Sequence, residues 1–205
     1  MFSEFLKHIF PKIILKNNLK ISYTFCLGGL SLLAFFILCI SGILLSIYYE
    51  PTPERAYNSI LFIEENILLG KYLRDMHRFS NHLFLVLLFL HTLRVILTGV
   101  YRLRSYNWII GMILLVLSLF EAYSGYLLPM DQLSLWATQT GMNLLESIPF
   151  GKGIKDLLVV HNIQTNYTLL RFYILHIIIV PIIMLIFISI HFYRIRKDKG
   201  VLPYI

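Results

Sequence analysis

The chain has 205 residues, of which 58% are hydrophobic and 14% are charged. A soluble domain carries about 25% charged residues, so this composition, with a mean hydropathy of +0.73, excludes an ordinary soluble protein and indicates an integral membrane protein. The net charge of +7 does not indicate nucleic-acid binding, because the basic residues stand at the edges of apolar stretches. Cys26 and Cys39 are too few for a disulfide framework.

The first 20 residues are basic and amphipathic. They lack the long apolar core and the cleavage site of a signal peptide. We therefore expect an amphipathic helix that lies in the membrane interface.

Four apolar stretches follow, and each is long enough to cross a bilayer, which takes about 20 residues in a helix. They cover about residues 21–49, 75–101, 107–128 and 170–193. The sequence thus predicts an all-α membrane protein: a single domain over 1–205 with four transmembrane helices. Between the third and fourth stretches, residues 129–169 contain prolines and glycines that interrupt regular structure.

Basic residues set the expected orientation. They are concentrated in the N-terminal segment, in the turn after the second span, and at the C-terminus, whereas the linkers 50–74 and 129–169 are of mixed charge. The positive-inside rule then places both termini on the cytoplasmic, or negative, side of the membrane. In this arrangement the second and fourth spans run parallel, from the positive side to the negative side.

The two parallel spans each contain two histidines that could hold metal. His77 and His91 are 14 positions apart, which puts them within about 40° of one helix face and about 21 Å apart along it. His176 and His191 are 15 apart, or about 60° and about 22 Å. A lone histidine in a membrane span is more often a packing residue, but four at matching depths predict two bis-histidine haems.

Glycines repeat this interval in the other two spans. Gly28 and Gly42 are 14 apart, and so are Gly111 and Gly125. Small residues also serve helix–helix packing, but the shared interval favours the close approach of two planar groups to the backbone.

Three segments, HRFSNHLFLVLLFLHTLR, SGYLLPMDQLSLWA and RFYILHIIIVPIIMLIFISIH, resemble the cytochrome b/b6 family, and the resemblance covers nearly the whole chain as a cytochrome b N-terminal-type domain. It implies that His77 and His176 ligate the positive-side haem, and His91 and His191 the negative-side haem. The segment FCLGG resembles the start of the first b6 helix, which implies a third haem bound covalently to Cys26.

The resemblance also implies partners for haem propionates and candidates for the quinone sites. The propionate positions are Arg74, Arg94 and Arg171, with Trp108 near the negative-side haem; interfacial snorkelling is an equal alternative for each arginine. The quinone-site candidates are Tyr126, Trp136 and Arg196.

Two features depart from the family pattern. The proline–tryptophan–aspartate of the family is here Pro129-Met130-Asp131, and Glu121 replaces an apolar residue. A carboxylate within a span needs a partner or a neutral state. We therefore expect Glu121 to handle protons or to pair with a polar group, with a protonated side chain bonded to a backbone carbonyl as the alternative.

The function implied by the resemblance is transmembrane electron transfer in a quinol:cytochrome c, or plastocyanin-like acceptor, oxidoreductase. The chain would act only as a subunit of a dimeric complex in an energy-transducing membrane, such as a bacterial inner membrane. Its partners would be a Rieske iron–sulfur protein, a c-type cytochrome and a separate subunit with the remaining cytochrome b helices. The alternative is the dihaem membrane anchor of a quinone-reducing dehydrogenase or hydrogenase.

Overall fold

The computed structural model describes residues 26–197, and these residues contain helices and no strand. The interfacial helix expected over the first 20 residues lies outside this range. In chain order the helices are α2 (Leu27–Ser46), α3 (Ala56–Asn66), α4 (Gly70–Leu97), α5 (Val100–Leu103), α6 (Ser105–Leu127), α7 (Gln132–Glu146), α8 (Gly151–Leu158), α9 (Asn166–Ile174), the π-helix η2 (Leu175–Ile179) and α10 (Val180–Lys197).

Four helices are long and apolar enough to cross a membrane, as the sequence predicts. They are α2, α4, α6 and the continuous helix formed by α9, η2 and α10, over Asn166–Lys197. The second span begins at Gly70, five residues before its expected start. Gly70 is required there because a Cβ at this position would collide with the backbone carbonyl of Ile63 in α3, so the chain turns sharply and α4 starts at once.

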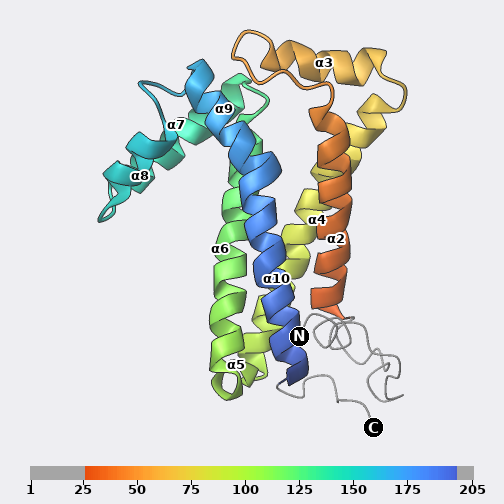
Figure 1. Ribbon diagram of the computed structural model, residues 1–205, viewed down its shortest axis with the longest axis vertical. Coiled ribbons are helices and arrows are strands. Elements are labelled where there is room, and N and C mark those ends of the chain that lie inside the picture. Colours follow the sequence, from red (N-terminus) through yellow and green to blue (C-terminus); the bar gives the residue numbers. More distant parts are fainter. Residues whose placement is uncertain (1–25, 198–205) are drawn as a thin grey trace.

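The spans form two adjacent pairs, α2 with α4 and α6 with α10 (Figure 1). α3 lies across the upper end of α2 and α4, and α7, α8 and α9 gather at the same upper end beside α6. α5, the start of α2 and the end of α10 lie at the opposite, lower end. α4 and α10 therefore run in the same direction through the bundle, which is the parallel arrangement that the charge pattern predicts.

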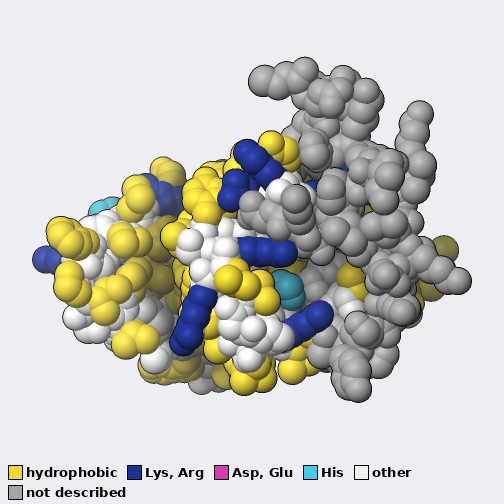
Figure 2. All heavy atoms as spheres, turned by 90° about the horizontal axis from the view of Figure 1, so that it is seen from below, with side chains coloured by type: hydrophobic (Ala, Val, Ile, Leu, Met, Phe, Trp, Pro, Cys, Tyr) yellow, Lys and Arg dark blue, Asp and Glu magenta, His cyan; other side chains and the backbone are white. Residues whose placement is uncertain are grey.

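The lower end is basic. The last turn of α10 carries Arg194, Arg196 and Lys197, and α5 carries Arg102. Figure 2 shows this end of the molecule with several Lys and Arg side chains and no Asp or Glu side chain in view among the described atoms. By the positive-inside rule this end is expected on the cytoplasmic side.

Two helices occur in the segment that the sequence predicts to be a linker before the fourth span. Asp131 caps α7, because its Oδ1 accepts a hydrogen bond from the backbone N–H of Ser134 at 2.7 Å. α8 follows, and Lys155 in α8 forms an ion pair with Glu146 at the end of α7. The linker thus forms a small helical layer at the upper end, attached to α6 through the hydrogen bond from Tyr123 to the carbonyl of Thr138.

The fourth span contains a π-helical turn that follows from Pro181. The N–H of Val180 donates to the carbonyl of Leu175, five residues back, and Pro181 has no N–H to continue the regular pattern. A π-turn adds one residue to the helix without adding a turn. The 15-residue spacing of His176 and His191 is therefore equivalent to about 14 residues of regular α-helix. The two side chains then lie as close to one helix face as those of His77 and His91 do.

A compact apolar cluster fills the middle of the bundle. It consists of buried side chains from three spans: Ala34, Phe35, Phe84, Val180 and Met184. Phe84 lies seven residues from both His77 and His91 in α4, so the cluster separates an upper histidine level from a lower one.

Candidate functional site

The upper histidine pair consists of His77 in α4 and His176 in η2. Their ring centroids are 6.3 Å apart. Because an imidazole nitrogen binds a metal ion at about 2 Å, this spacing suits one metal atom between the two rings. No group of three or more His, Cys, Asp or Glu side chains that could hold a metal occurs within residues 26–197, so the remaining ligands would have to come from a group such as a porphyrin.

Both rings of the upper pair are oriented by hydrogen bonds at Nδ1. The hydroxyl of Ser41 lies 2.8 Å from Nδ1 of His77. Nδ1 of His176 lies 3.0 Å from the carbonyl oxygen of Glu121 and 3.2 Å from the hydroxyl of Ser124. A metal-bound histidine characteristically engages its second nitrogen in this way. Nε2 of each ring is then left for a metal.

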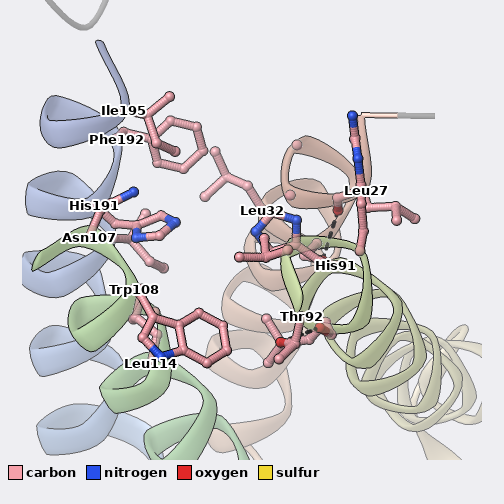
Figure 3. A pocket seen from close by; sticks show the side chains of 18 of the residues that line it. Leu27, Leu32, His91, Thr92, Asn107, Trp108, Leu114, His191, Phe192 and Ile195 are labelled. Atoms are coloured by element: carbon pink, nitrogen blue, oxygen red, sulfur yellow. Dashed lines mark hydrogen bonds between the residues drawn. The ribbon is translucent and has the colours of Figure 1, made fainter. Parts of the chain in front are cut away.

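The lower histidine pair consists of His91 in α4 and His191 in α10. Figure 3 shows the two rings on opposite walls of one cavity. The cavity has a volume of about 650 Å³, which is in the range of cofactor sites. Its walls are mainly apolar, with Asn107 and Trp108 from α6 among the lining residues. The buried Nδ1 of His91 has no hydrogen-bond partner within the described residues.

Each of the four expected glycines lies against one of the four histidine rings. A Cβ added to Gly28 would be 3.2 Å from the ring of His91. The other pairs are Gly42 with His77 at 3.2 Å, Gly111 with His191 at 3.5 Å, and Gly125 with His176, where the Cβ would collide with the ring.

These glycines therefore come from α2 and α6, and the histidines from α4 and the fourth span. Paired imidazoles and backbone without Cβ atoms occur at both levels, and orienting groups at Nδ1 occur at the upper level. These features suit a planar, bis-histidine haem. The residues fit two such groups.

Cys26 lies at the lower end of α2, directly before its first residue. Its side chain is exposed, and it lines the same cavity as Gly28 and His91. Cys39 differs in its surroundings, because it is partly buried and packs against the apolar cluster in the middle of the bundle.

The expected propionate residues are divided between the two levels. Arg94 and Trp108 line the lower cavity, together with Arg104, which the sequence analysis does not single out. Arg74 forms an ion pair with Glu64 of α3, and Arg171 donates a hydrogen bond to the carbonyl of Leu157. The two upper arginines are thus engaged by protein groups in this structure.

The quinone-site candidates are also separated. Tyr126 in α6 and Trp136 in α7 have exposed side chains, at 46% and 65%, near the upper end. Neither lines the lower cavity, whereas Arg196 does. Cys26 and Arg196 therefore line the same cavity.

The bundle, with two histidine levels between parallel spans, has the arrangement expected of a haem-binding membrane cytochrome. A family model described as cytochrome b/b6/petB matches residues 13–199 of the chain. The chain belongs to the cytochrome b/b6 family.

Characterised relatives support this assignment. The chain is 44% identical over 174 residues to cytochrome b6 of Heliomicrobium gestii, a match that covers 84% of this chain and 82% of the relative. It is 33% identical over 201 residues to the menaquinol:cytochrome c reductase cytochrome b subunit of Bacillus subtilis, covering 97% and 90%.

A solved structure of a hyperthermophilic respiratory complex III contains a chain with the same fold. The TM-score is 0.75 at 27% identity, and the match covers 96% of this chain and 51% of that chain. This chain thus spans about half the length of the chain in that complex. Family membership implies b-type haems and partner subunits, as in the respiratory and photosynthetic bc complexes.

Proposed function

We propose that the chain is the transmembrane electron-transfer subunit of a quinol:cytochrome c, or plastocyanin-like acceptor, oxidoreductase. The observation that carries this proposal is the arrangement of four histidines as an upper and a lower pair across parallel spans, each ring against a glycine. His77 and His176 would hold one b-type haem, and His91 and His191 the other.

The haems supply one-electron oxidation and reduction, and the protein's own residues set the conditions for it. The histidines would hold iron at two depths, and Ser41 and Ser124 orient the upper rings. The apolar cluster around Phe35 and Phe84 keeps water out of the space between the two levels. A low dielectric constant and fixed ligands limit the rearrangement that accompanies each change of charge.

The two ends of the bundle would contribute to two quinone sites. At the upper, positive side, the exposed Tyr126 and Trp136 would form part of a quinol-oxidising pocket. At the lower side, Arg196 lines the cavity beside the lower pair and would face a quinone-reducing pocket. The Bacillus relative is named for menaquinol, and we propose a quinol as the donor here.

We further propose a third haem, attached to Cys26 through one thioether bond. Its exposed thiol lines the cavity of the lower histidine pair. A haem at this position would lie beside the lower quinone pocket.

The chain would form one domain over 1–205 and work within a larger, dimeric complex in a bacterial inner or related energy-transducing membrane, with the basic lower end toward the cytoplasm. A Rieske protein, a c-type cytochrome and a subunit with the remaining cytochrome b helices would complete it. The alternative is the anchor of a quinone-reducing dehydrogenase or hydrogenase, which would also need paired histidines.

Affinity purification of the chain from its native membrane distinguishes these functions. We expect co-purification of a Rieske protein, a c-type cytochrome and a second helical subunit, with quinol:cytochrome c reductase activity that the chain alone lacks. Recovery of a soluble dehydrogenase or hydrogenase in place of the Rieske protein would favour the alternative. Full activity of the isolated chain would contradict the proposal of a multisubunit enzyme.

A further inference from the structure

Glu121 contacts the upper histidine pair directly. Its carboxylate Oε1 lies 3.2 Å from Nδ1 of His176, and its own backbone carbonyl lies 3.0 Å from the same nitrogen. The side chains of His176 and Glu121 are only 16% and 18% exposed. The carboxylate therefore belongs to the immediate surroundings of a proposed haem ligand, although it does not itself reach the metal-facing nitrogen.

The carboxylate has a reason to engage His176. Its second oxygen, Oε2, is buried and has no hydrogen-bond partner among the described residues. A buried polar oxygen without a hydrogen bond is costly. The carbonyl oxygen of Glu121 accepts hydrogen bonds from Nδ1 of His176 and from the hydroxyl of Ser124, and the carboxyl oxygen Oε1 is a second acceptor within hydrogen-bonding distance of the same nitrogen.

The four histidines differ in this respect. Nδ1 of His77 is paired with the neutral hydroxyl of Ser41, and neither Nδ1 of His91 nor Nδ1 of His191 has a hydrogen-bond partner in the described part of the chain. Within residues 26–197, His176 alone among these four histidines has a carboxyl group beside its ring. The asymmetry distinguishes the upper level from the lower one.

We propose that Glu121 is a positioning residue that lowers the reduction potential of the upper haem by hydrogen-bonding His176. This inference rests on the proposed function, in which His176 is an iron ligand. A carboxyl oxygen that accepts a hydrogen bond from Nδ1–H of His176 makes the imidazole a stronger electron donor to iron, which favours the oxidised state.

Redox titration of the intact complex tests the inference. The upper haem is identified as the b-type wave that persists in His91→Ala. At a fixed potential, we expect Glu121→Leu to increase the ratio of reduced to oxidised upper haem about tenfold. This corresponds to a rise of about 59 mV in the midpoint potential of a one-electron couple. Glu121→Gln, which keeps a neutral acceptor, should give a smaller rise. The electron paramagnetic resonance of that ferric haem should shift in both variants.

Tyr123→Phe is the matched control. It removes a polar group two positions away in α6, where the hydroxyl bonds the carbonyl of Thr138 and not a histidine, and both waves should stay in place. The inference would be overturned if the upper haem had the same midpoint potential in the Glu121 variants as in this control. It would also be overturned if the midpoint potentials of both haems shifted equally. If Glu121→Leu does not accumulate, Glu121→Gln decides alone. Absence of an upper b-type wave in the unaltered protein would instead contradict the proposed function.

Discussion

At the level of single residues, the proposed haem at Cys26 can be tested independently of the histidine-bound haems, because it is attached by a covalent bond. We expect the chain to keep the mass of one haem after denaturation, because a thioether survives conditions that release histidine-bound haem. Cys26→Ser should abolish this added mass. Intact mass spectrometry and haem staining of a denaturing gel measure both.

Cys39→Ser provides the control for this prediction. Cys39 is the other cysteine of the chain and lies within α2, but it packs against the apolar cluster and does not line the lower cavity. The added haem mass should be unchanged in Cys39→Ser. A bare polypeptide mass for the unaltered chain would refute the covalent haem and leave the two histidine-bound haems unaffected.

The histidines and glycines can be identified from their spacing of 14 or 15 residues. In a straight helix this spacing determines both the direction in which a side chain points and its depth in the membrane. The same reasoning cannot reveal the partners at Nδ1. Ser41 and Ser124 come from other helices than the histidines that they contact, and their positions depend on how each helix is rotated. For Glu121 the sequence indicates that a partner is needed, and only the packing of α6 against η2 identifies it as His176.

At the level of elements, the π-turn in the fourth span reconciles the two unequal histidine intervals. It predicts opposite results for two single-residue deletions. Deleting Ile178, within η2, should convert the π-turn to an ordinary turn and keep His176 and His191 on one face. Deleting Ile186, in the regular part of α10, should rotate His191 by about 100° relative to His176.

The two deletions are matched, because both remove an exposed isoleucine between the same two histidines, with 48% and 55% of the residue exposed. A pyridine haemochrome assay of the purified chain should show the full number of non-covalent haems after deletion of Ile178 and fewer after deletion of Ile186. Equal haem content in both variants would contradict the role assigned to η2.

The elements themselves were predictable to different degrees. The four spans follow from length and hydropathy, and the structure confirms all four. α3 was missed within the first linker, although Ala56, Ile60 and Ile63 follow helical spacing and are buried. Its 11 residues are too few for a span and include Glu64 and Glu65 near the end, so hydropathy alone gave no signal. The π-turn was missed because an interval of 15 by itself does not reveal a change in hydrogen bonding.

On the scale of the whole molecule, the two histidine levels and the apolar cluster between them would define, in the proposed function, one path for electrons across the membrane. The lower end collects the basic side chains of α5 and α10 and the cavity that contains Cys26 and Arg196. The upper end collects α3, α7, α8 and α9 (Figure 1). The two ends are chemically different, which agrees with the proposal of one quinone site on each side.

The most direct test of the central claim is a redox titration of the visible α band in membranes that contain the unaltered complex, His91→Ala or His176→Ala. The unaltered complex should show two b-type waves. His91→Ala should lose the lower-level wave and keep the upper one, and His176→Ala should do the reverse, because each variant removes one axial ligand from one level. Two waves of normal amplitude in either variant would contradict the assignment of two bis-histidine haems.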